Sequence, residues 1–331
     1  MILSLSIHAQ GGKEFLQWLK EYSPTGYFVI NDYETRANKP GDHKQWIRST
    51  TVPLPVVPVH ETGHMRNMEL NSDGDTRRSY YIGNLKDFSI RPNFSPFNSK
   101  EMMADIPASL ENFQTDFYIS GKAGVDAASQ SGGMIDIMEE WNQYIVGLKA
   151  DVEMVACYKA NFNTTQNWND LANDANSSIQ SVTEFRYFVL RYIMWAQKKY
   201  PATYAKIIGA SDLKELYTYL VQYAEKTAQE WIALMTEKNM DTKTKNGFDW
   251  YWKFQVELQK PEYVELEKLM LVTPVRIALN RPVPPGLLGE GERTAVFDLQ
   301  GRRIPASQAI RAIHVLRGKS ETMAVLNRPG Q

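Results

Sequence analysis

Hydrophobic and polar residues follow two different patterns along the chain, and the pattern changes near residue 133. Before that point, β-branched and aromatic residues gather in short runs between turn-forming residues: GYFVINDYE (26–34), QWIRSTTVPL (45–54), RSYYIGNLKDFSI (78–90) and DFYIS (116–120). Runs of this kind are typical of β-strands. Helical spacing predicts a short amphipathic helix over residues 13–22 and another over SKEMMADI (99–106), ended by Pro107. The first part is therefore predicted to hold a sheet and a few helices.

Beyond residue 133 the pattern becomes helical. Large apolar residues recur every three or four positions, at Ile137, Trp141, Tyr144, Leu148, Val152 and Val155. This spacing predicts one long helix with a buried stripe. Further helices are expected over residues 177–198, stopping before Pro201, and over 212–225, 226–238 and 261–270. Because strands come first and helices later, we expect an α+β fold and not alternating βαβ units.

The two ends of the chain differ from the part between them. Residues 1–12 (MILSLSIHAQGG) have two interpretations, the remnant of a secretory signal or a first β-strand. Proline and glycine gather in residues 279–292, which predicts a linker after a main domain over 13–278. Residues 293–331 carry short strand-like runs around turns. There, DLQGRR followed by Gly318-Lys319 resembles the small C-terminal β-modules of secreted Bacteroidetes proteins.

Composition narrows the classes of function. The 331 residues are 43% hydrophobic and 23% charged, with a formal net charge of -1, as in ordinary globular proteins. A nucleic-acid-binding surface needs clustered lysine and arginine, so this charge balance argues against a nucleic-acid partner. No apolar run reaches the length of a membrane span. Cys157 is the single cysteine, which excludes an intrachain disulfide.

The clearest chemical signal is the stretch VPVHETGHMRNMEL, in which His60 and His64 are four positions apart. On a helix both side chains project from the same face, and two imidazole nitrogens so placed can reach one Zn²⁺ at about 2.0–2.1 Å. Glu61 then stands beside the metal, where its carboxylate can accept a proton from metal-bound water. Pro58 is compatible with this helix if it lies in the first turn. In the alternative interpretation these are solvated residues at an exposed helix start, but the apolar residues around the motif argue against it.

A catalytic zinc normally takes three protein ligands and keeps one position for water. The stretch GGMIDIMEEWNQYIVG supplies Glu140 at the edge of the buried stripe, four positions before Tyr144. Glu139 is instead expected on the polar side of the same helix. Glu140 is therefore the predicted third ligand, so Glu140→Ala is expected to remove the metal and Glu139→Ala to do little. In the alternative, Glu140 pairs with an arginine such as Arg186 or Arg191.

Tyr144 lies one helical turn after Glu140, where its hydroxyl can donate a hydrogen bond to a developing oxyanion, or its ring can simply pack. HETGH followed by Glu140 on a second predicted helix resembles the gluzincin branch of the zincin metallopeptidases. The segments SKEMMADIP, DFYISG and EEWNQYIVGLK also resemble a set of uncharacterised bacterial zincin-like proteins. In those proteins E-F-x-A-Y marks the third-ligand helix, and EWNQY matches it at the glutamate and the tyrosine.

This resemblance implies a zincin-like metallopeptidase fold with an N-terminal sheet, a mostly helical second half and the small C-terminal β-module. It further implies an edge strand just upstream of the metal helix, here QWIRSTTVPL, that lines the cleft and pairs with an extended peptide.

The expected function is a zinc-dependent hydrolase, in particular a peptidase acting on peptide or protein substrates, with a secreted, periplasmic or cell-surface location. In this hypothesis His60, His64 and Glu140 hold Zn²⁺, Glu61 is the general base and Tyr144 assists. A first alternative is a catalytically inactive zincin-like protein with a binding or structural role at the cell envelope. A second is an intracellular helical interaction protein.

Overall fold

The computed structural model describes residues 14–37, 41–47, 52–71, 76–124, 127–272, 296–297 and 303–304. The chain divides into two compact units, Met1–Ile277 and Ala278–Gln331. In the second unit, β3 (Val296–Phe297) pairs antiparallel with β4 (Arg303–Ile304). Residues 1–12, the predicted linker and the remainder of the predicted β-module lie outside the described residues.

The described residues of the first unit are mostly helical and include one small sheet. Residues 14–22 are helical, as predicted. The further helices are α2 (Pro24–Arg36), η1 (Asp42–Trp46), α3 (Val56–Leu70), η2 (Ser99–Asp105), η3 (Ala108–Leu110), η4 (Thr115–Ser120), α4 (Ala128–Ser131), α5 (Met134–Asn161), α6 (Thr165–Asp174), α7 (Asn176–Lys199), α8 (Pro201–Gly209), α9 (Ser211–Glu237), α10 (Phe248–Glu257) and α11 (Pro261–Met270). The strands β1 (Arg78–Tyr81) and β2 (Asp87–Ile90) form an antiparallel hairpin. This content is compatible with the predicted α+β class.

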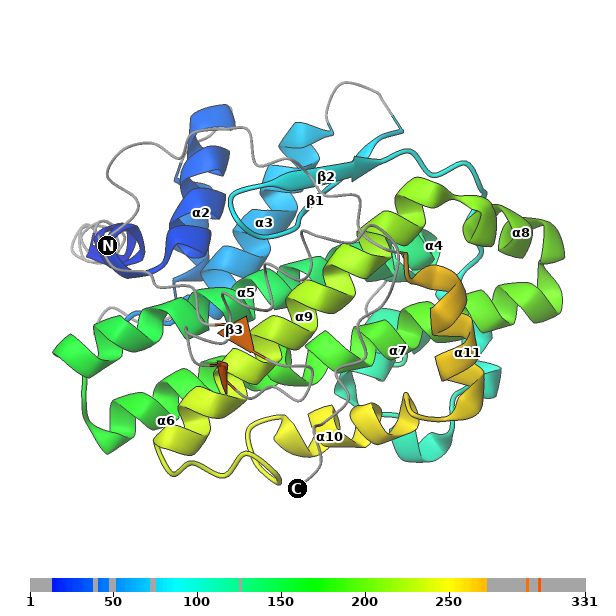
Figure 1. Cartoon of the computed structure of the whole chain (residues 1–331). Helices are drawn as coiled ribbons and strands as arrows, with labels where there is room; N and C mark the ends of the chain where they lie inside the picture. The colour runs from blue at the N-terminus through cyan, green and yellow to red at the C-terminus, as the bar shows by residue number, and fades with distance from the viewer. Residues whose placement is uncertain are drawn as a thin grey trace, which may run out of the picture. The chain divides into compact units, whose positions relative to one another are not determined.

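Three long helices of the first unit, α5, α7 and α9, run side by side and contact one another (Figure 1). The residues of the predicted apolar stripe are buried, apart from the partly buried Val152, but the other faces of α5 are largely buried as well. Trp141 of this stripe is fully buried, and its indole N–H donates to the Val182 carbonyl oxygen of α7 over 2.9 Å. None of the helices that the structure describes is both long enough and apolar enough to cross a membrane.

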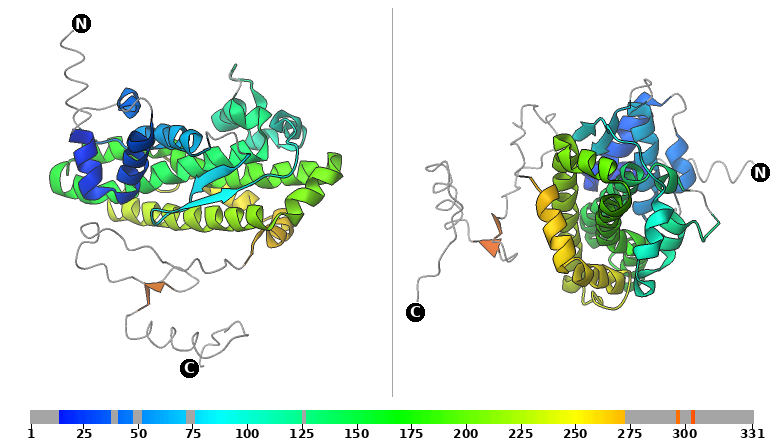
Figure 2. Two further views of the ribbon diagram at one scale, coloured as in Figure 1. Left: turned by 90° about the horizontal axis from the view of Figure 1, so that it is seen from above. Right: turned by 90° about the vertical axis from the view of Figure 1, so that its right-hand side faces the viewer.

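A second layer, made of α2, α3 and the β1–β2 hairpin, packs against α5 (Figures 1 and 2). Arg66 of α3 is 1% exposed and donates hydrogen bonds to Asp32 of α2 at 2.8 Å and to both Asp87 oxygens of β2 at 2.8 and 2.7 Å. Asn142 of α5 bonds both backbone groups of Tyr81 in β1. The charge-assisted bonds of Arg66 join α3 to α2 and the hairpin, and the bonds of Asn142 join the hairpin to α5. Together they fix how α3 faces α5.

The strand predicted over residues 26–34 is wrong, because this segment belongs to the helix α2. Ser23 precedes the helix, and its hydroxyl accepts a hydrogen bond from the Gly26 N–H at 3.2 Å. Pro24 stands in the first turn, where its fixed backbone angle favours a helix. The buried residues of α2 recur at helical spacing. A capped start and this spacing outweigh the strand preference of the individual residues.

Other predicted strands also differ from the structure. Within residues 45–54, the described part holds the end of η1 and a segment that leads into α3, with no strand. Residues 116–120 lie in η4, a π-helix. Residues 78–90 form two paired strands, and the two helices predicted after residue 212 are the single helix α9. The edge strand implied upstream of the metal helix is therefore absent from the described residues.

Gly63, inside the HETGH motif, lets α3 approach α5 closely. A Cβ atom at this position would lie 1.8 Å from Gln143 Oε1 of α5. Gln143 is 1% exposed and donates to Glu139, so it has little room to move. We expect Gly63→Ala to lower the free energy of unfolding by about 1–3 kcal/mol through overpacking, as measured by urea denaturation. Gly209→Ala is the control, because a Cβ there meets no atom within 4 Å. Equal stability of the two variants would contradict this close packing.

Candidate metal centre

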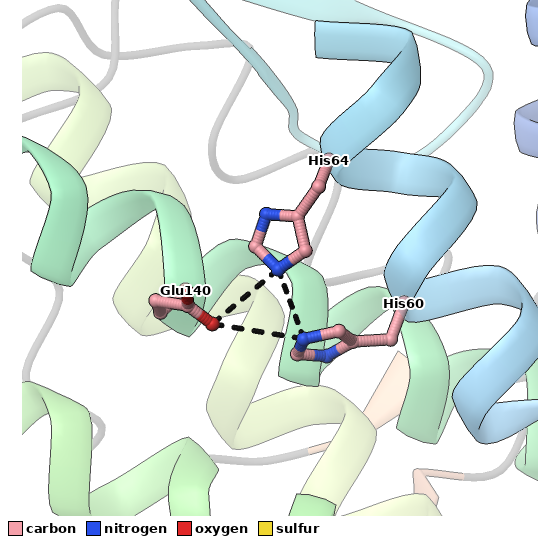
Figure 3. Close-up of side chains that lie close together, drawn as sticks. All are labelled: His60, His64 and Glu140. Carbon is pink, nitrogen blue, oxygen red and sulfur yellow. Dashed lines mark hydrogen bonds and ion pairs between the residues drawn. The ribbon is translucent and has the colours of Figure 1, made fainter. Parts of the chain in front are cut away.

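The helix α3 starts just before the HETGH motif. The N–H of its first residue, Val56, donates to Asp174 Oδ2 at 3.0 Å. Pro58 lies in the first turn, where its missing N–H removes no intrahelical hydrogen bond. The helix therefore forms as predicted, and His60 and His64 project from one face toward α5 (Figure 3).

The three side chains predicted as metal ligands converge in space (Figure 3). His60 Nε2 and His64 Nε2 are 3.0 Å apart, and Glu140 Oε2 lies 3.6 Å from the first and 3.3 Å from the second. Ligand atoms about 2.0–2.1 Å from a tetrahedral zinc are separated by about 3.3 Å, so the three distances fit one zinc-sized position. In the part of the chain that the structure describes, no other group of three or more histidine, cysteine or acidic side chains converges in this way.

Burial and charge make this position suitable for a cation. His60 is 6% exposed, and Glu140 Oε2 is buried without a hydrogen-bond partner. Burial opposes ionisation of Glu140, but the imidazoles of His64 and His60 lower its pKa to about 2. Burial also opposes protonation of His64, yet the Glu139 and Glu140 carboxylates raise the pKa of His64 well above its usual value. A buried carboxylate that stays ionised requires positive charge beside it, and without a metal the protonated His64 supplies that charge. A metal ion bound here would take over this role once His64 releases its proton.

The alternative partners of Glu140 are occupied elsewhere. Arg186 forms ion pairs with one glutamate of α9 and one of α11. The guanidinium of Arg191 lies over two tyrosine rings. The neighbours of the Glu140 carboxylate are therefore the two imidazoles and not an arginine.

Glu139 also belongs to the site, so the expectation that its polar side of α5 faces away from the histidines is wrong. Its Oε2 lies 2.5 Å from His64 Nδ1, and its Oε1 accepts hydrogen bonds from Asn67 Nδ2 at 2.9 Å and Gln143 Nε2 at 3.1 Å. Both glutamates thus contact His64, Glu139 at Nδ1 and Glu140 at Nε2. A carboxylate at the outer nitrogen of a metal-binding histidine fixes the ring and leaves the other nitrogen for the metal.

A pocket of about 410 Å³ opens beside His60, and Glu61, Tyr118 and Tyr144 are also among the residues that line it. Glu61 is only half-buried, so its carboxylate can meet a molecule in the pocket. The Tyr144 ring packs edge-on against His60 with 4.5 Å between centroids. The two predicted catalytic residues therefore border the same pocket as one predicted ligand.

Tyr118 also lines the pocket. The strand predicted for its segment gave no reason to expect it there. It extends from the π-helix η4, and its hydroxyl lies 2.8 Å from the Tyr144 hydroxyl. Burial and the nearby Tyr144 raise the pKa of Tyr118, and burial raises that of Tyr144, so both hydroxyls stay protonated and can donate. Asn112 marks the turn before η4, because its Oδ1 accepts hydrogen bonds from two backbone N–H groups. This turn residue was the available sequence signal against a strand.

Glu184 of α7 is a fully buried carboxyl group next to η4. It accepts hydrogen bonds from Gln180 Nε2 at 2.7 Å and from Thr115 Oγ1 at 3.5 Å. Burial raises the pKa of Glu184 to about 8, from an ordinary value of 4.5, although the hydrogen bonds lower it. Between these two values the folded protein keeps a proton that the unfolded chain has released, so the Glu184 contribution to stability falls as pH rises.

We therefore expect wild-type protein to lose more unfolding free energy than Glu184→Gln between about pH 5 and about pH 8. Glutamine keeps the acceptor and does not titrate, so comparison of the two proteins cancels the contributions of other groups. Urea denaturation at both pH values provides the measurement. Parallel losses in wild type and variant would show that Glu184 is ionised in the folded protein.

No family model, curated protein or solved structure matches this chain. The fold and the site define a mostly helical protein with a buried His-His-Glu group that can hold a metal ion. Its function is argued from these residues.

Proposed function

We propose that this chain is a zinc-dependent hydrolase, in particular a peptidase, whose metal is held by His60, His64 and Glu140. One observation carries the proposal: the three ligand atoms converge beside the pocket that Glu61 lines. Two imidazoles and one carboxylate form a donor set typical of catalytic zinc, which leaves a coordination position for water or substrate. The spacing of the three atoms supports zinc, as does the buried Glu140 oxygen that has no hydrogen-bond partner.

Bound zinc supplies a Lewis acid that polarises a carbonyl oxygen and lowers the pKa of a coordinated water to about 7. Glu61 takes a proton from the attacking water while the water oxygen bonds to the carbonyl carbon. The same carboxylate then delivers the proton to the amine nitrogen as the C–N bond breaks. Tyr144 donates a hydrogen bond to the oxygen that becomes negative, and Tyr118 positions the Tyr144 hydroxyl.

We further propose a relationship to zincin-like gluzincins, because the order of the ligands along the chain is the same. The described residues upstream of α3 hold no edge strand with which a peptide can pair, so we propose a different contact for the substrate. In our proposal the substrate contacts the pocket wall formed by α6 and the start of α7.

Chelator-sensitive cleavage of a peptide library tests this function. Zinc-loaded full-length protein is incubated with a mixed library, and mass spectrometry identifies the cut bonds with and without 1,10-phenanthroline. We expect cleavage that disappears with the chelator and returns with added zinc. A protein that binds zinc but cuts no peptide would reject the peptidase proposal and favour the zincin-like binding or structural protein.

A further inference from the structure

The pocket beside the metal centre also has an acidic wall. In addition to the residues named above, its lining consists of Leu54, Val56, Val57, Asp170, Asn173, Asp174 and Ser177. The two aspartates lie on α6, and no lysine or arginine is among the described residues that line the pocket. The pocket therefore combines a metal centre, an apolar surface and a negatively charged wall.

The acidic wall lies about one helical turn from the metal ligands. Asp174 Oδ2 accepts the Val56 N–H at 3.0 Å, which places this carboxylate at the N-terminus of α3. Val56 precedes His60 by four residues, and a helix rises 1.5 Å per residue, so the two positions are about 6 Å apart along the axis. Leu54 and Val57 supply apolar lining in the same region. This separation suits an extended side chain of lysine or arginine length.

At this pocket His60 has a buried polar atom without a partner, and Asp151, which does not line the pocket, has two. His60, which is 6% exposed, lines the pocket, and its Nδ1 makes no hydrogen bond. Asp151 of α5 is completely buried, and neither of its carboxyl oxygens is hydrogen-bonded. Burial and the charge of Asp174 raise the pKa of Asp151 well above its usual value. The raised pKa reduces the negative charge of Asp151, so the charge of the acidic wall comes from Asp170 and Asp174.

We infer that the acidic wall recognises a lysine or arginine side chain in the residue next to the bond that is cut. This inference rests on the proposed hydrolase function and names its substrate class. The apolar stem of the side chain lies along Leu54 and Val57, and the cationic head meets Asp170 and Asp174. A neutral side chain of the same length gains the apolar contact alone, and an acidic side chain is repelled.

A binding measurement tests the inference without requiring turnover. Full-length Glu61→Gln protein is loaded with zinc and titrated with two fluorescent peptides that differ only in lysine or norleucine at one position. We expect the lysine peptide to bind about tenfold more tightly, because an ion pair in partly exposed surroundings contributes on the order of this factor. The double variant Asp170→Asn, Asp174→Asn should remove the preference. Asparagine at 174 still accepts the Val56 N–H, and Asp249→Asn on α10 is a control that should keep the preference.

The possible outcomes separate this inference from the proposed function. Equal affinity for the two peptides would overturn the inference and leave the hydrolase proposal intact, as would library cleavage without enrichment of basic residues at the cut sites. Absence of any chelator-sensitive cleavage by wild-type protein would instead reject the hydrolase. Circular dichroism checks that the double variant is folded. If the double variant unfolds, the single variant Asp170→Asn is tested instead, because Asp170 caps no helix. An unchanged preference for the lysine peptide in this variant would refute the proposed role of the acidic wall.

Discussion

Replacing Glu61 by glutamine should leave zinc binding intact and lower the rate of peptide hydrolysis by about 10²–10⁴-fold, the usual contribution of general acid–base catalysis. Glu61 is not one of the three convergent ligands, but it lines the pocket beside them. Glutamine has nearly the same size and can still accept a hydrogen bond, yet it cannot take a proton from water. Elemental analysis and a peptide-cleavage assay on the same preparation measure both halves of this expectation.

Glu69→Gln is the matched control for this variant. Glu69 lies on the same helix but is not among the residues that line the pocket, so we expect it to keep wild-type activity. If Glu61→Gln keeps full activity, another residue is the base. If it loses zinc, the assignment of Glu61 as a residue outside the ligand set is wrong.

Glu140→Ala should weaken zinc binding far more than Glu139→Ala does. Glu140 supplies an oxygen that converges with the two imidazole nitrogens, whereas Glu139 acts through His64 Nδ1. Loss of a group that only orients a ligand typically costs 10–100-fold in metal affinity. We therefore expect about 10–100-fold weaker zinc binding for Glu139→Ala, and a larger loss for Glu140→Ala. Competition with a chromophoric chelator measures both affinities.

Glu139→Gln separates the two ways in which Glu139 can act. Its amide oxygen still accepts a hydrogen bond from His64 Nδ1, so this variant should bind zinc more tightly than Glu139→Ala. A greater loss in Glu139→Ala than in Glu140→Ala would make Glu139 the third ligand. Unchanged zinc affinity in all the glutamate variants would show that α5 supplies no metal ligand.

The principal parts of the site could be predicted because they follow from short-range helix geometry. His60 and His64 share a face because they are one turn apart, and this is true of any helix that contains them. The position of Glu140 followed from its phase relative to the apolar stripe of α5. Both arguments need only the sequence of one helix at a time.

Residues brought in by packing between helices could not be predicted in this way. Consecutive residues of a helix differ by about 100° in direction, which suggested that only one of Glu139 and Glu140 faces the histidines. The two carboxylates reach opposite nitrogens of one ring because His64 lies between them. Asp174 likewise joins the site through the contact of α6 with the start of α3.

The errors in the fold have a related cause. The aromatic and β-branched residues after Pro24 have a strand preference, but such preferences depend on context. The cap at Ser23 and the packing of α2 on α3 decide the structure of this segment. Its helical spacing and its proline-led start were readable in the sequence. The conformation of η4 depends on long-range contacts as well as on the turn at Asn112.

The most direct test of the central claim is the zinc content of the purified protein, determined by elemental analysis for wild type, His60→Ala and His64→Ala. The geometry of the three ligand atoms predicts close to one zinc per chain in wild type and little in either variant, because each variant leaves only two of three ligands. Wild-type protein that takes up no zinc, or full zinc retention in both variants, would contradict the assignment of His60, His64 and Glu140 as a metal centre.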